Sequence, residues 1–146
     1  MTAPEGPVLA VVREYFERMW NAHDFSTFDA YVSPDVVYHP PRGPAKGYEG
    51  YRAMAERFVK GIPDLHFEIE GAVEAGDTVA LRLRITGTHR GEHLGVPATG
   101  RRVEVQGRPW LRVKEGKVVE VWSLYDERGM LEQMGVLSLE SPARKA

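Results

Sequence analysis

The sequence predicts an α+β fold in which N-terminal helices pack on the concave face of a curved antiparallel sheet. Up to Gly61, apolar residues recur at the three- and four-residue spacing of helices with one buried face. From Leu65 onward apolar and polar residues alternate, which is the period of half-buried antiparallel strands. Helices that cross the concave side of a bent sheet leave a cone between the two layers, and such a cone is a natural pocket for a small molecule.

Three helices are expected in the first part of the chain. The first begins at Pro7, which is tolerated in the opening turn because its missing N–H would be unpaired there, and it ends near residue 23. A short second helix is expected over residues 26–32. The third is expected over residues 48–60, and Gly61 ends it.

The strands that follow are joined by tight turns, at Gly76-Asp77 and at Glu115-Gly116. Pro109 interrupts one of them, and because proline cannot donate a backbone hydrogen bond, we expect a bulge or a sheet edge there. The strands are expected at residues 36–38, 65–73, 79–86, 103–113 and 118–125, followed by a short helix at 130–134.

Length and composition are those of one globular domain. The chain has 146 residues, 42% of them hydrophobic and 27% charged, and its net charge is −2. Such a balance argues against a nucleic acid or an anionic membrane as a partner. We expect a single domain over residues 1–146, with an ordered core at about residues 6–137 and a flexible tail at residues 138–146.

The chain contains no cysteine, which excludes disulfides, a thiolate nucleophile and zinc–thiolate or iron–sulfur sites. Its longest aliphatic run, Val8 to Val12, is far shorter than the ~20 residues that a membrane helix needs. Arg13 and Glu14 follow this run directly, so no signal peptide is expected. We expect a cytoplasmic protein.

Glycine-rich turns and strand residues form an extended pattern in the second half of the chain. The pattern comprises Gly95–Arg101, Gly116–Glu120 and Gln133–Gly135, with Trp122 and Asp126 before the last segment. It resembles the SnoaL-like polyketide cyclase family, and the resemblance covers most of the chain. It implies the nuclear transport factor two-like cone, which is often dimeric, in agreement with the layout predicted from periodicity.

The resemblance also implies an enzyme without a cofactor. Characterised cyclases of this family close the last ring of an aromatic polyketide by intramolecular aldol condensation, often on a methyl ester, and use an acid/base aspartate at the position of Asp126. A histidine on the preceding strand assists them, whereas the stretch Arg108–Arg112 of this chain has none. The expected partners are a small hydrophobic or polycyclic ligand and, in a homodimer, a second copy of the chain.

Asp126 has two interpretations. It follows Trp122 and Leu124 at strand spacing, so the three side chains should share a face. If that face lines an apolar cone, burial raises the pKa of the carboxyl group and makes it a base near neutral pH. In the other interpretation Asp126 is the N-cap of the helix that follows.

Aromatic rings are the candidate walls of the pocket. Tyr15, Tyr38, Trp110 and Trp122 each offer a large apolar ring with one hydrogen-bond donor, which suits stacking on a flat polycyclic ligand. The alternative for each of them is an ordinary place in the core.

Histidines and arginines supply the remaining candidates. His39 ends a strand near the expected mouth of the cone, and Arg112 could bind a substrate oxygen where the family has its histidine, or form surface ion pairs instead. His89 and His93 have the spacing of two metal ligands on a helix, but the glycines and proline around them predict a loop, so no metal site is expected.

Three functions remain open at this point. The first is a cyclase or related lyase or isomerase that uses Asp126 as its base. The second is a non-catalytic small-molecule binder of the same fold. The third is another proton- or water-transfer enzyme, such as an isomerase or an epoxide hydrolase; epoxide opening would require further buried carboxylates beside an arginine.

Overall fold

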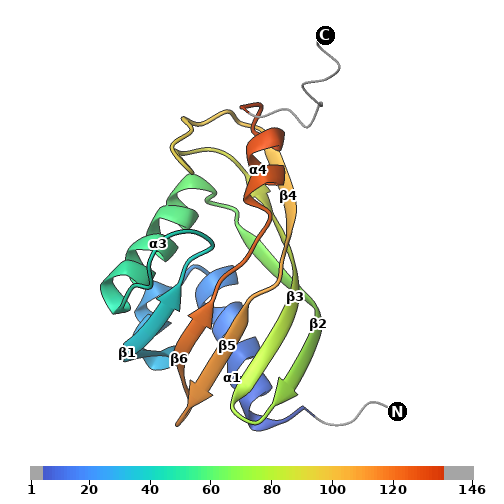
Figure 1. Ribbon diagram of the computed structural model, residues 1–146. Coiled ribbons are helices and arrows are strands. Elements are labelled where there is room, and N and C mark those ends of the chain that lie inside the picture. Colours follow the sequence, from blue (N-terminus) through green and yellow to red (C-terminus); the bar gives the residue numbers. More distant parts are fainter. Residues whose placement is uncertain (1–4, 137–146) are drawn as a thin grey trace.

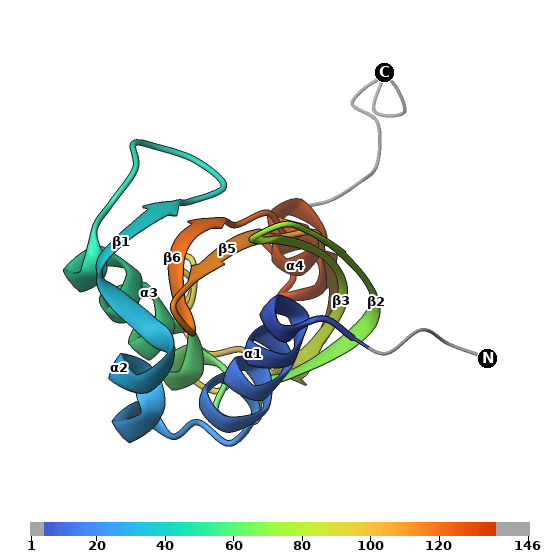
Figure 2. The ribbon, with the colours of Figure 1, turned by 90° about the horizontal axis from the view of Figure 1, so that it is seen from below.

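A computed structural model describes residues 5–136 of the chain. Within them the predicted α+β fold is confirmed, with helices against the concave side of a curved sheet (Figures 1 and 2). Five of the six strands follow the order β1–β6–β5–β3–β2, and the sixth, β4, pairs with β3 outside this path. The sheet stays open between β1 and β2. The tail predicted at residues 138–146 lies outside the described residues.

The first helix continues through a change of helical type. Helix α1 (Pro7–Tyr15) has Pro7 at its start, as predicted, and passes directly into the π-helical segment η1 (Phe16–Asn21). A π-helical turn holds more residues than an α-helical one, so it changes which side chains face inward. The buried side chains of η1 are Phe16, Met19 and Trp20.

The other predicted helices are present with small changes of boundary. The second is a 3₁₀ turn, η2 (Phe25–Thr27), followed by the short helix α2 (Phe28–Tyr31). Helix α3 spans Tyr48–Gly61, and helix α4 spans Glu127–Gln133, earlier than the sequence indicated. Each shift is within the range expected at helix ends, where periodicity is least informative.

Strand β1 corrects the prediction of a wholly antiparallel sheet. It spans Val32–His39 and pairs in parallel with β6 (Lys117–Trp122), so the sheet is mixed. The chain leaves β1 through α3, enters the sheet again at its opposite edge and returns last as β6. So long a connection allows two neighbouring strands to run in the same direction, and periodicity along one strand carries no information about it.

The remaining strands are antiparallel, as predicted. They are β2 (His66–Ala75), β3 (Thr78–Thr88), β4 (Arg102–Gly107) and β5 (Trp110–Lys114). Pro109 does interrupt the pairing, but instead of a bulge or an edge within one strand it separates two strands, β4 and β5, that pair with different parts of β3.

The core lies between the helices and the inner face of the sheet. Along β3 the inward side chains are Val79, Leu81, Leu83 and Ile85, all at most 3% exposed. Figure 2 shows the sheet curving around α1. Within residues 5–136, every helix is too short or too polar to cross a lipid bilayer.

Candidate active site

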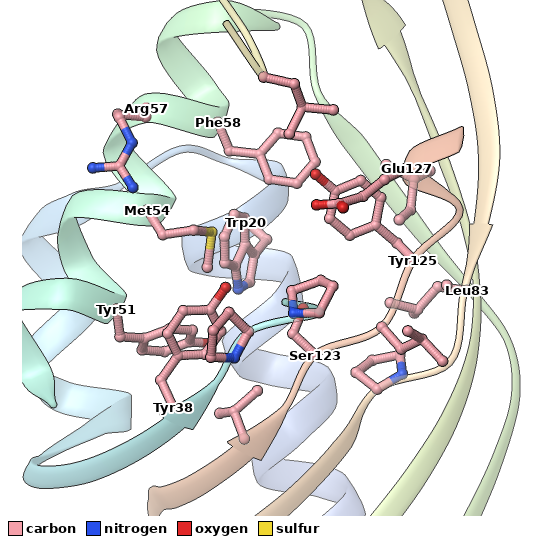
Figure 3. A pocket seen from close by; sticks show the side chains of 18 of the residues that line it. Trp20, Tyr38, Tyr51, Met54, Arg57, Phe58, Leu83, Ser123, Tyr125 and Glu127 are labelled. Atoms are coloured by element: carbon pink, nitrogen blue, oxygen red, sulfur yellow. The ribbon is translucent and has the colours of Figure 1, made fainter. Parts of the chain in front are cut away.

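A cavity of about 560 Å³ lies between the helices and the inner face of the sheet (Figure 3). Its volume falls within the range of about 300–1,000 Å³ that is typical of small-molecule sites. Helix α3 and segment η1 form one side, and strands β3, β5 and β6 form the other. The aromatic residues of its lining are Phe16, Trp20, Tyr38, Tyr51, Phe58, Phe67 and Tyr125.

The end of β6 and the turn after it alternate between the cavity and the outside. Val121, Ser123, Tyr125 and Glu127 all line the cavity. Of the residues between them, Trp122 and Asp126 are exposed and lie outside the lining, whereas Leu124 is exposed but also borders the cavity. This alternation extends the two-residue period of the strand beyond its last ladder residue.

Glu127 places a carboxylate at the cavity. Its side chain is 18% exposed, and its Oε1 accepts a hydrogen bond of 2.9 Å from Nε of Arg42. Burial raises the pKa of Tyr125, and the nearby charge of Glu127 raises it further. Figure 3 shows the Glu127 carboxylate beside the Tyr125 ring. A carboxylate in an apolar, aromatic site has the chemistry required of a general base.

Hydroxyl groups lie on the same cavity. Burial raises the pKa of Tyr38, the Ser123 hydroxyl lowers it and the charge of Glu127 raises it, so these three groups lie close together. Tyr51 also lines the cavity, and its hydroxyl is 2.7 Å from the hydroxyl of Tyr15. Such O–H groups can donate hydrogen bonds to a ligand oxygen.

Tyr15 supports the cavity from behind. It is fully buried and is absent from the lining, but its hydroxyl contacts Tyr51. Burial raises the pKa of both phenols well above the ordinary value. Both side chains therefore stay neutral, and Tyr15 acts on a ligand only through Tyr51.

His93 lines the cavity on the side of Phe58. Its ring stacks on that of Phe58 with centroids 4.6 Å apart, and the residue is 7% exposed. Burial lowers the pKa of His93 to about 4, and the neighbouring His89 contributes to the decrease. The imidazole is therefore neutral at physiological pH, and a neutral imidazole has one donor and one acceptor nitrogen.

Asp126 lies outside this cavity. Its side chain is exposed, and its Oδ1 accepts a hydrogen bond of 2.8 Å from the backbone N–H of Gly129. It is the N-cap of α4, which is the second of the two interpretations given above. Trp122 and Asp126 lie on the outer face of the chain, whereas Leu124, which the spacing predicted on the same face, also borders the cavity.

Four further predicted ligand residues lie together on the outer face of the sheet. Trp122 pairs across the strands with both His39 and Trp110, and the His39 ring stacks on it with centroids 5.3 Å apart. Arg112 donates to Glu120 over 2.8 Å, and Glu120 also accepts from His39 over 2.8 Å. Four aromatic residues were predicted to line the pocket, and within residues 5–136 only Tyr38 of these four lines the cavity.

Some of the cavity residues that the sequence did not single out could still have been grouped from the strand spacing. Ser123, Tyr125 and Glu127 have the same parity as Val121, and this could be read from the strand spacing. The sequence does not show which face of the last strand points inward, because the residues on both faces include aromatic and apolar side chains. The sequence indicates His93 only as a possible metal ligand, through its spacing from His89. Across residues 5–136, no three histidine or carboxylate side chains gather as metal ligands would.

Fold and cavity together define an α+β cone with a cavity lined by aromatic rings. The family model for SnoaL-like polyketide cyclases matches residues 10–134 of the chain. The chain belongs to this family.

Named relatives share this fold and sequence pattern. Aklanonic acid methyl ester cyclase DauD of Streptomyces sp. (strain C5) is 30% identical over 106 residues, which cover 72% of this chain and 65% of that protein, slightly less than two thirds. The solved structure of AclR from Streptomyces galilaeus, a proposed hydroxylase, is 32% identical with a TM-score of 0.82, and the match covers 94% of this chain and 87% of that one. IdmH from Streptomyces antibioticus, a proposed polyketide cyclase, is 31% identical with a TM-score of 0.79 and coverages of 90% and 100%.

Proposed function

We propose that this protein is a cyclase-type enzyme that moves a proton at carbon in an aromatic carbonyl or ester ligand, without a cofactor. The observation that carries the proposal is the carboxylate of Glu127 in a cavity walled by aromatic rings. Membership of the cyclase family supports the reaction class. A ring-closing aldol step needs a base, a donor for the developing oxyanion and a shape that folds the substrate on itself.

The chemistry assigns a role to each polar group. Glu127 removes a proton from the carbon next to a carbonyl group, and the resulting enolate carbon forms a bond to a ketone carbon of the same molecule. The proton then passes to the new alkoxide oxygen, so no atom is lost and the carboxylate is restored. The hydroxyls of Tyr38, Tyr51 and Ser123 donate to the enolate oxygen while it carries negative charge.

Aklanonic acid methyl ester is the first substrate to test, because it is the compound in the name of DauD. It is a candidate for this chain on that ground and because it is an ester, one of the two ligand classes proposed here. The ring-closed product of an aldol reaction has the same mass as the substrate, so the assay must separate the two by chromatography before mass spectrometry.

A matched pair of variants identifies the base. Glu127→Gln removes the carboxylate of the cavity, and general-base catalysis contributes about 10²–10⁴-fold, so at least a hundredfold loss of turnover is expected. Asp126→Asn preserves a good N-cap and is expected to keep turnover near that of the wild type. The reverse pattern would overturn the role of Glu127 and return the base to Asp126.

A non-catalytic binding protein is the second candidate, and the position of Asp126 favours it. The aspartate that the family resemblance marks as catalytic is exposed and hydrogen-bonded to a helix N-terminus. A binder would take up the ester with similar affinity in the wild type and in Glu127→Gln, and neither protein would form a product.

We also propose that the protein is a homodimer through the outer face of its sheet. One row of side chains in register crosses five strands and is apolar over most of its length: His39, Trp122, Trp110, Ala80 and Val73. Trp110 is 55% exposed and Val73 is 67% exposed. Exposed apolar surface of this kind is common at protein–protein contacts.

A further inference from the structure

One nitrogen at the cavity lacks a hydrogen-bond partner. Nε2 of His93 is shielded from solvent, and no group in residues 5–136 donates to it or accepts from it. A buried polar atom without a partner costs free energy, so such atoms are rare in folded proteins. His93 also belongs to the cavity lining, so a small rotation of its ring would bring Nε2 to a bound ligand.

The loop that carries His93 is firmly held. His93 and Val96 exchange two backbone hydrogen bonds, of 3.1 and 2.9 Å. The loop packs against the end of α3 so closely that a Cβ at Gly61 would lie 2.6 Å from the carbonyl oxygen of Glu92. Since the imidazole also stacks on Phe58, its position is set from several directions, and these contacts oppose a large movement toward another partner in the protein.

His89 completes this support. It is fully buried, and its two ring nitrogens contact the Thr99 hydroxyl at 2.9 Å and the Val96 carbonyl oxygen at 3.1 Å. One histidine of the loop is therefore fully hydrogen-bonded, whereas its neighbour at the cavity is not. This difference indicates that His93 has a role other than holding the loop together.

We propose that His93 is a specificity-determining residue that pairs with a hydroxyl group of the ligand. This inference rests on the proposed function, because it takes the cavity to be the ligand site. The ligand class it names is a flat aromatic carbonyl compound with a free phenol or enol on the ring next to Phe58. An analogue without that O–H leaves the imidazole unpaired, and sites built around a ligand hydroxyl discriminate strongly against such analogues.

Two small ketones test the proposal by isothermal titration calorimetry on the full chain. The probes are 6-hydroxy-2-acetylnaphthalene and 6-methoxy-2-acetylnaphthalene, which differ in the hydrogen-bond donor. One hydrogen bond is expected to make the hydroxy compound bind about 5- to 10-fold more tightly to the wild type. In His93→Phe this ratio of affinities is expected to fall to about 1, because the ring stacking is kept and the nitrogens are lost.

Further variants distinguish the imidazole of His93 from other polar groups that could pair with the phenol. His93→Gln keeps an acceptor and is expected to keep part of the ratio. His66→Gln makes the same change at an exposed histidine of β2 and is expected to leave the ratio unchanged. Glu127→Gln is expected to retain the ratio as well, which excludes the carboxylate as the partner of the phenol.

The outcomes of the titrations test the role of His93 and the ligand class separately. Equal affinity of the two ketones for the wild type, or an undiminished ratio in His93→Phe, would overturn the role of His93 and leave the proposed function intact. Absence of binding by either ketone would overturn the ligand class itself. If His93→Phe does not fold, the ratio in the wild type and its decrease in His93→Gln still test the inference.

Discussion

Asp126 and Glu127 are adjacent carboxylates that lie on opposite sides of the chain. Glu127 lines the cavity and pairs with Arg42 at 2.9 Å, whereas Asp126 is exposed and caps α4 through the N–H of Gly129. Asp126 is the N-cap of α4 and Glu127 is its first residue, so a single step along the chain separates a group that stabilises a helix from one that can meet a ligand.

The capping role of Asp126 predicts a stability effect. Asp126→Ala is expected to lower the free energy of unfolding by about 1 kcal/mol, because the N–H of Gly129 loses its acceptor. Asp126→Asn is expected to cost little, since asparagine is an equally good N-cap. Urea titrations of the two variants measure the difference. Equal stability of the alanine and asparagine variants would mean that the cap contributes nothing.

The Tyr15–Tyr51 hydroxyl pair predicts an asymmetric pair of substitutions. Tyr51→Phe leaves the hydroxyl of Tyr15 fully buried without its partner and is expected to cost about 1–3 kcal/mol of stability. Tyr15→Phe is expected to cost less, because Tyr51 borders the cavity, where water can replace the lost partner of its hydroxyl. A double-mutant cycle in thermal or urea unfolding measures the coupling, and a coupling near zero would argue against the bond.

The low pKa of His93 predicts a pH dependence of stability. The folded pKa of about 4 lies below the ordinary value of about 6.5, so between these values the unfolded chain binds more protons. Stability from this residue is complete above about pH 6.5 and falls as the pH decreases toward 4, by at most about 3 kcal/mol. The neighbouring His89 lowers the pKa of His93, whereas Glu92 raises it.

His93→Phe isolates this effect from the titration of carboxylates. Urea midpoints of the wild type and the variant, measured at intervals from pH 7.5 to pH 4.5, should show the wild type losing stability relative to the variant as the pH falls, because only the wild type loses the histidine contribution. Parallel curves for the two proteins would show that the pKa of His93 is near its ordinary value.

The proposed dimer predicts a change of mass in solution. Trp110→Glu puts a charge in the middle of the apolar row on the outer face, and burial of an unpaired charge at an interface is unfavourable. Sedimentation equilibrium is expected to give a dimer for the wild type and a monomer for this variant. Lys60→Glu, on the exposed side of α3, is the control and should remain dimeric. A monomeric wild type would end the proposal.

Most elements of the fold could be predicted from periodicity. The three-to-four residue spacing before Gly61 and the alternation after Leu65 gave the helices and strands, and Pro109 gave the break between β4 and β5. These are local properties of the backbone and of side-chain spacing. The parallel pairing of β1 with β6 could not be predicted, because it joins segments far apart in the chain.

The sequence by itself determined the α+β class, the family and the set of residues that share each face of the last strand. Only the tertiary structure decided which face meets the helices, and with it that Glu127 rather than Asp126 lies at the cavity and that Trp110 and Trp122 lie outside. The reason is physical: alternation fixes relative orientation along a strand, whereas inside and outside are defined by what packs against it. Both faces of β6 are apolar enough to be buried, so the choice belongs to the assembled fold.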